Sequence, residues 1–187
     1  MIAVTVEHEV YNYSIGDRML TTLIYNVDGQ EIKRYSHYHS SDWLPDGRLL
    51  LLGGPTPENY GIHILDKGFN HISQLDNGGK FKTFIGSADV SPSGKQVVFE
   101  YNRQIWIMNM DGTGLGPLIK GNSSYLNPTW SPDGNYIAFL DSYARNSYDT
   151  LVHIYDIKSK KHLSVDTNKV FTNDGRKSPR GPLSWTK

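Results

Sequence analysis

The histidines are the most reactive candidates in this sequence, since it contains no cysteine. The absence of cysteine excludes a thiolate metal site, a cysteine nucleophile and a disulfide framework. His37 and His39 are two residues apart, and Asp42 follows them. On an extended segment such a pair points the same way and, with a carboxylate, could share a metal ion. Ordinary polar loops also contain such pairs, so we predict no metal site. If a metal ion were bound, these three residues would be the candidate ligands.

Two other kinds of catalytic site can be tested by motif. The sequence contains no Gly-x-Ser-x-Gly, the elbow that presents a hydrolase serine at a strand-to-helix turn. The segment from Gly112 to Gly116 is rich in glycine, but it joins two expected strands and no helix follows to bind a phosphate. A turn explains these glycines. We therefore predict no cofactor and no catalytic residue, and the sequence favours a protein that is not an enzyme.

The balance of positive and negative residues indicates which partners the protein does not bind. The 187 residues include 19 Lys and Arg against 19 Asp and Glu, a formal net charge of zero. Binding a polyanion requires a surplus of clustered cations, so we predict no nucleic-acid partner. The longest aliphatic run, Leu49 to Leu52, is far shorter than the roughly 20 residues of a membrane helix. We predict no membrane span, and the first residues show no secretory leader.

Three short segments share a strand-turn-strand pattern, which determines where the candidate residues lie in the fold. In each, a turn of the Pro-Asp-Gly or Pro-Ser-Gly type is followed by a run of apolar residues. Proline presets the first turn position and glycine accepts the left-handed one. Each segment therefore predicts a strand, a tight turn and a returning strand. The three segments are residues 42–48, 89–95 and 129–135.

Two further strands follow each hairpin. The third strand is rich in β-branched and aromatic residues and ends at an aspartate, and the fourth is shorter. His63 and His153 fall at matched positions of their third strands, which we interpret as a feature of the repeat. The third strands are expected at 60–66, 104–112 and 151–156, and the fourth strands at 71–75, 116–119 and 162–165.

The unit recurs at intervals of about 40–55 residues, the range of a propeller blade. We predict an all-β fold, a β-propeller of about four blades in one domain over residues 1–187, each blade a four-stranded antiparallel sheet. The first blade lacks its innermost strand, and the C-terminal residues match that strand. We expect the C-terminal strand to complete the first blade and hide two sheet edges. The expected blades are residues 1–36 with 182–187, 37–83, 84–121 and 122–175.

The segment from Thr129 to Gly134 with Ile137-Ala138-Phe139, preceded by Ile105 to Thr113, resembles the WD40-like repeat of the TolB propeller family. The resemblance covers the whole chain, with departures such as Leu44 and Val90. It implies a propeller, usually of six blades, often outside the bacterial cytoplasm and acting by binding proteins. Four blades depart from that number, which leaves open a four-bladed ring, a homodimer with eight blades and part of a longer propeller.

The loops that open on one face of a propeller, around its channel, offer a binding surface. They are rich in tyrosine and arginine, two residue types enriched at interface hot spots. Arg176 and Arg180 would favour an acidic partner segment or a terminal carboxylate. Trp43, Trp130 and Trp185 recur at one position of their blades, so packing explains them. The predicted binding residues are Tyr38, His39, Tyr60, Tyr125, Asn127, Tyr143, Arg145, Arg176 and Arg180.

The sequence thus predicts a non-catalytic module that binds a protein or peptide, or serves as a scaffold. An alternative is a metal-dependent propeller lyase with His37 and His39 among its ligands. A third interpretation is a half-propeller that needs a second copy or another domain. The compartment is left open, because only the family resemblance indicates the periplasm or the extracellular space.

Overall fold

The computed structural model describes the chain as a succession of β-strands in two compact units, Met1–Ile85 and Gly86–Lys187. Each unit is described by itself. Within the described part of the chain, no helix is long and apolar enough to cross a membrane. The described residues are 1–8, 19–56, 58–76, 80–81, 84–119, 123–142, 150–166 and 185.

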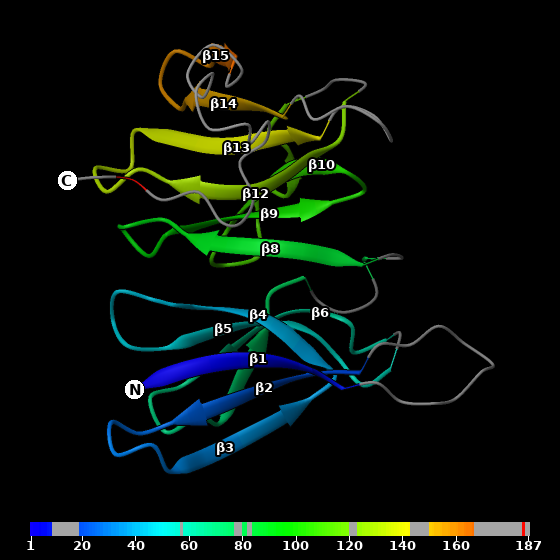
Figure 1. Cartoon of the computed structure of the whole chain (residues 1–187), viewed down its shortest axis with the longest axis vertical. Helices are drawn as coiled ribbons and strands as arrows, with labels where there is room; N and C mark the ends of the chain where they lie inside the picture. Colours follow the sequence, from blue (N-terminus) through cyan, green and yellow to red (C-terminus); the bar gives the residue numbers. More distant parts are fainter. Residues whose placement is uncertain are drawn as a thin grey trace, which may run out of the picture. The chain divides into compact units, whose positions relative to one another are not determined.

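The first unit contains two antiparallel sheets, seen in Figure 1 in blue and in cyan to green. One has the strand order β1-β2-β3 and the other the order β4-β5-β6-β7, so strands adjacent in sequence are adjacent in space. The first sheet consists of β1 (Ile2–His8), β2 (Met19–Tyr25) and β3 (Glu31–Ser36). The second consists of β4 (Tyr38–Trp43), β5 (Leu49–Gly53), β6 (Gly61–Leu65) and β7 (His71–Gln74).

Two further four-stranded antiparallel sheets follow, with the orders β8-β9-β10-β11 and β12-β13-β14-β15. These meanders confirm the predicted all-β fold of four-stranded blades. The third sheet consists of β8 (Ile85–Val90), whose first residue ends the first unit, β9 (Gln96–Tyr101), β10 (Gln104–Asn109) and β11 (Gly116–Pro117). The fourth consists of β12 (Tyr125–Trp130), β13 (Tyr136–Ser142), β14 (Thr150–Asp156) and β15 (His162–Asp166).

The predicted turns join the first two strands of each of the three later sheets. Gly134 has a φ of 71°, and its N–H donates to the Ser131 carbonyl oxygen at 2.9 Å. The Asp133 side chain accepts the Asn135 N–H at 3.0 Å, which closes the turn from within. A left-handed φ of this kind is available to glycine at little cost, so the glycine positions fix where each strand reverses.

The second strand of each of these sheets carries the core. All five residues of β5 are buried, and Leu49 to Leu52 are fully inaccessible to solvent. Val97, Val98 and Phe99 of β9 are equally inaccessible. A strand covered on both faces reads as a continuous apolar run, which explains the aliphatic blocks that follow each turn.

Among the described residues, the first sheet has three strands. The segment 182–187, expected to complete it, lies outside the described residues except for Trp185. The Trp185 indole N–H donates to the Thr129 carbonyl oxygen of β12 at 3.4 Å, a contact within the second unit. Completion of the first sheet by the C-terminus therefore stays a prediction.

Candidate functional site

Five of the nine predicted binding residues lie among the described residues. Tyr38, His39 and Tyr60 belong to the first unit, and Tyr125 and Asn127 belong to the second. The other four, Tyr143, Arg145, Arg176 and Arg180, lie outside the described residues.

His39 and Tyr60 hold the backbone at the start of β8. The Nε2 atom of the buried His39 lies 2.7 Å from the carbonyl oxygen of Ile85, and the Tyr60 hydroxyl accepts the Ile85 N–H at 2.9 Å. Burial lowers the pKa of His39, against the opposing effect of the Ile85 carbonyl. Burial raises the pKa of Tyr60, so both side chains are neutral near pH 7. Both polar groups of the Ile85 backbone are thus fixed by side chains of the sheet β4–β7.

The residue before Ile85, Phe84, projects into solvent. Its side chain is 59% exposed and stacks on the His39 ring, with centroids 4.5 Å apart and planes 13° from parallel. We call His39, Tyr60, Phe84 and Ile85 the Phe84 rim. Sequence analysis included residue 84 in a predicted blade but did not name it among the binding residues. Its position beside a buried histidine depends on tertiary contacts between distant residues.

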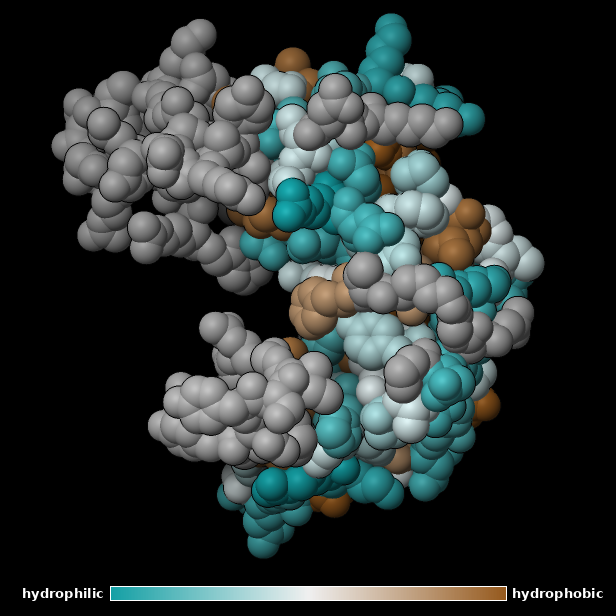
Figure 2. Space-filling model, turned by 90° about the vertical axis from the view of Figure 1, so that its right-hand side faces the viewer, coloured by the Kyte–Doolittle hydropathy of each residue, from teal (hydrophilic) through white to brown (hydrophobic). Residues whose placement is uncertain are grey.

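Phe84 is one of several large hydrophobic residues that are exposed in the described part of the chain. Figure 2 shows hydrophobic residues as small separate areas among hydrophilic ones on the described part of one face of the molecule. Isolated exposed apolar side chains are normal. Phe84 is a candidate because its exposed ring also stacks on the buried His39. The other large exposed hydrophobic residues are Met1, Ile2, Val27, Ile32, Ile72, Tyr136 and Leu163.

The other described candidates have internal partners. Tyr38 packs edge-on against Tyr35 and His63, and burial raises its pKa. Tyr125 is buried against Phe139. Asn127 has a φ of 52° at an irregular point of β12, and its side-chain oxygen accepts a hydrogen bond from the Ser87 hydroxyl at 3.0 Å. These contacts give Tyr38, Tyr125 and Asn127 a role in packing.

The three metal candidates of the sequence face different surroundings. His37 lies in the turn before β4 with a φ of 70°, so the alternation rule for extended segments does not apply to it. His39 Nε2 faces the carbonyl oxygen described above, and Asp42 accepts the Trp43 N–H at 2.8 Å. Among the described residues there is no group of three His, Cys, Asp or Glu side chains that could hold a metal ion.

The matched histidines of β6 and β14 have different partners. His63 Nε2 faces the carbonyl oxygens of Asn59 and Gly53, at 2.8 and 3.1 Å, while its Nδ1 is 3.1 Å from Nε2 of His71. Burial lowers the pKa of His63, the Asn59 carbonyl opposes this effect, and the nearby His71 adds to it. His63 is therefore neutral, with both ring nitrogens in contact with polar atoms.

In β14, His153 lies between a serine and an aspartate. Its Nδ1 is 3.0 Å from the Ser164 hydroxyl, and its Nε2 is 3.4 Å from a carboxylate oxygen of Asp141. Burial lowers the pKa of His153, and the Asp141 carboxylate partly restores it. Serine, histidine and aspartate in this order form the relay of a nucleophile and its base. The three residues lie on β15, β14 and β13, so we interpret their contacts as a polar bridge across three strands.

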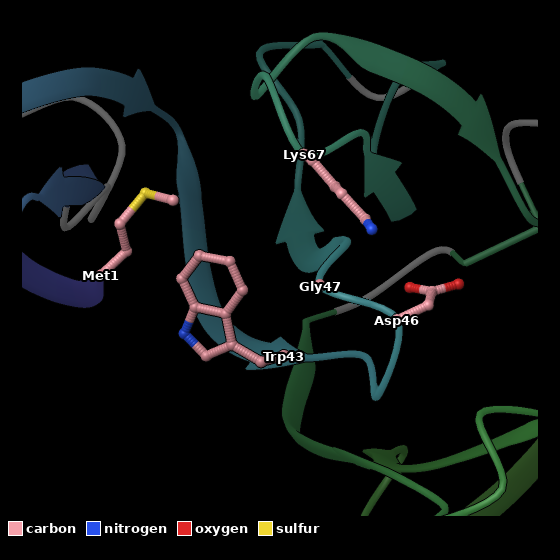
Figure 3. A pocket seen from close by; sticks show the side chains of 5 residues that line it. All are labelled: Met1, Trp43, Asp46, Gly47 and Lys67. Carbon is pink, nitrogen blue, oxygen red and sulfur yellow. The ribbon is translucent and has the colours of Figure 1, made fainter.

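A surface hollow of about 340 Å³ lies beside the first turn of the sheet β4–β7. Figure 3 shows the Trp43 indole near Met1, with the charged ends of Lys67 and Asp46 on the other side of the opening. Hydrogen bonds from the Arg48 backbone N–H and guanidinium lower the pKa of Asp46. The negative charge of this carboxylate is therefore already paired with Arg48. We assign no ligand to this hollow. Its lining residues are Met1, Trp43, Asp46, Gly47 and Lys67.

Comparison with known proteins identifies the fold. The structure of a TolB protein from Agrobacterium tumefaciens aligns with 87% of this chain, with a TM-score of 0.58 and 18% identity. It is equally similar, at TM-score 0.58 and 18% identity, to TolB from Acinetobacter baumannii over 83% of the chain. A chain of the nidogen/laminin complex matches at TM-score 0.58 and 10% identity over 80% of the chain. The protein therefore has the fold of a TolB-like β-propeller.

Sequence comparison adds a partial match. The chain is 35% identical over 66 residues to dipeptidyl-peptidase 5 from Porphyromonas endodontalis, which covers 30% of the chain and 10% of that protein. No family model matches the chain. The chain spans 60%, 39% and 59% of the three structures named above, so it corresponds to part of each.

Proposed function

We propose that this chain is a protein-binding β-propeller module and that the Phe84 rim anchors its partner. The observation that carries the proposal is the exposed, stacked ring of Phe84. Ordering a side chain on binding costs free energy, and a ring already held on His39 has lost much of its freedom beforehand. Aromatic side chains held in this way are typical of interface hot spots.

The partner class follows from the same surface and from the sequence. Phe84 would insert between apolar side chains of a protein or peptide, because its large apolar ring is exposed to solvent. Arg176 and Arg180, which the sequence predicts as binding residues, would favour acidic groups in a partner. The presence of a similar propeller in the nidogen/laminin complex supports a role in binding proteins. A place outside the bacterial cytoplasm is a further part of the proposal, and it rests on the resemblance of the sequence to the TolB family.

The partial match to dipeptidyl-peptidase 5 supports a second candidate function. The chain would then be the propeller part of a longer peptidase, and the Phe84 rim would contact another part of that protein. A homodimer with eight blades is a further assembly of the same kind. The mass of the protein in solution separates the homodimer from the other two alternatives, since a dimer has twice the mass of 21.1 kDa.

Photo-crosslinking tests the proposed surface. A photoreactive phenylalanine analogue is placed at position 84 and, as a matched control, at position 163, where Leu163 is similarly exposed at 64%. We expect a discrete adduct from position 84 that excess unlabelled wild-type chain suppresses and excess Phe84→Ala chain does not. The same adducts from both positions, or suppression by both competitors, would reject the Phe84 rim as the site.

A further inference from the structure

We propose that His63 and His71 form a two-histidine chelate for a first-row divalent cation such as Zn²⁺ or Ni²⁺, bridging β6 and β7. The site lies in the sheet β4–β7 and uses residues outside the Phe84 rim. It is independent of the proposed binding function.

The tautomer of His63 is fixed by its surroundings. Its Nε2 faces two carbonyl oxygens, those of Asn59 at 2.8 Å and Gly53 at 3.1 Å. A carbonyl oxygen accepts hydrogen bonds and cannot donate one, so Nε2 carries the proton. The Nδ1 atom of this neutral ring therefore holds a lone pair, the group that a metal ion requires.

The lone pair of His63 faces a second ring nitrogen. Nδ1 of His63 and Nε2 of His71 are 3.1 Å apart. Zinc–imidazole bonds of about 2.0–2.1 Å place two ligand nitrogens roughly 3.3–3.4 Å apart at a tetrahedral angle and about 2.9 Å apart at a right angle. The observed separation lies between these values. A cation can thus replace the shared proton when the nitrogens move by a few tenths of an ångström and the two rings turn so that both lone pairs point at it.

The environment of the pair matches that of a metal ligand in two respects. Ligating histidines usually donate their other ring N–H to a carbonyl or carboxylate oxygen, which orients the ring and raises its basicity. His63 has this arrangement, and the Tyr38 ring packs edge-on against it at 5.1 Å. His71 is exposed, so a cation can reach the pair from solvent and keep water at its remaining positions.

A buried carboxylate adds a favourable field. Asp76 is fully buried, and its Oδ1 accepts the Ile62 N–H at 3.3 Å. Its negative charge favours positive charge at the His63 ring. Burying a carboxylate is costly unless positive charge or donors compensate it, and a divalent cation on the neighbouring histidine would supply that compensation.

The fourth sheet offers a matched control. His153 and His162 occupy the corresponding strands β14 and β15, but their ring centroids are 5.7 Å apart and His153 Nδ1 faces the Ser164 hydroxyl. His153 Nε2 faces Asp141. The geometry that directs the lone pair of His63 at a second ring nitrogen therefore does not arise between these two histidines.

Calorimetric titration of the full chain with Zn²⁺, Ni²⁺ and Mg²⁺ tests the proposal, with His71→Asn as the variant and His162→Asn as its control. We expect one Zn²⁺ or Ni²⁺ per chain and no Mg²⁺, which prefers oxygen ligands. His71→Asn should weaken binding at least about tenfold, and His162→Asn should change it by less than about twofold. Equal loss in both variants, or none in either, would indicate binding by surface histidines in general and overturn the proposal.

Nitrogen NMR of the imidazole rings gives a second readout that does not depend on a variant. On addition of Zn²⁺, the Nδ1 resonance of His63 should shift while its Nε2 keeps its proton. A shift confined to His37 or His162 would overturn the assignment even if the stoichiometry were one.

Discussion

The sheets β4–β7 and β12–β15 follow the same plan and use it differently. Each begins with a strand, a tight turn and a buried second strand, and each carries a buried histidine in its third strand. His63 contacts two carbonyl oxygens and a second histidine, whereas His153 contacts a serine and an aspartate. The repeat fixes the position of the side chain, and the residues on neighbouring strands decide its chemistry.

The residue two places before each histidine shows the same principle. It is Gly61 in β6 and Leu151 in β14. A Cβ at Gly61 would lie 2.3 Å from Oδ1 of the buried Asp76 and 2.6 Å from Nε2 of Gln74. The absence of a side chain at Gly61 therefore leaves space in the sheet β4–β7 for the buried carboxylate of Asp76.

Substituting Gly61 by alanine adds a side chain at the position that the sheet β4–β7 leaves empty. Of the changes considered, it should have the largest effect on stability. Because Asp76 is fully buried and its Oδ1 accepts the Ile62 N–H, we expect Gly61→Ala to lower the free energy of unfolding by about 1–3 kcal/mol, the usual cost of overpacking a core. Urea denaturation measures the change. The control is Gly116→Ala in β11, where nothing lies within 4 Å of the added Cβ. It should change stability by less than about 0.5 kcal/mol. Similar losses in both variants would mean that Asp76 is not confined as described.

Lowering the pH should reduce the stability contributed by the buried histidines of the two sheets by different amounts. Burial lowers the pKa of His39 and of His153 below the ordinary value of 6.5. The folded state then binds fewer protons than the unfolded state, so stability is fully present above pH 6.5 and is lost as the pH falls below it. The Asp141 carboxylate counteracts the shift at His153, while His39 has only a carbonyl oxygen. The loss due to His39 should therefore be larger.

This difference is measured by urea unfolding at about pH 7.5 and about pH 5.5, where each unit of lowered pKa contributes at most about 1.4 kcal/mol. We expect His39→Gln to reduce the acid loss more than His153→Gln does. A greater reduction by His153→Gln would show that Asp141 does not protect that ring as the geometry indicates.

Much of the fold was predictable from local sequence. The Pro-Asp-Gly turn around Gly134 and the buried run from Leu49 to Leu52 are local signals, since each depends on a few consecutive residues. The matched positions of His63 and His153 also followed from the repeat. Structural similarity to TolB confirmed the propeller that these signals predicted.

The candidate site was less predictable, because exposure depends on contacts between distant residues. Phe84 projects outward since His39, 45 residues earlier, occupies the space beneath it. Tyr125 has the residue type of a binding site but packs against Phe139 on the neighbouring strand. The burial of Asp76 was equally hidden, since the glycine that admits it looks like any strand glycine in the sequence.

The affinity of the partner captured from position 84 tests the central claim most directly. It is compared for the wild-type chain, Phe84→Ala and Leu163→Ala, two variants that each remove one exposed apolar side chain. We predict that Phe84→Ala raises the dissociation constant about 30-fold, the effect of a hot spot worth about 2 kcal/mol, while Leu163→Ala leaves it within about twofold. Equal dissociation constants for all three chains would contradict a binding role for the Phe84 rim.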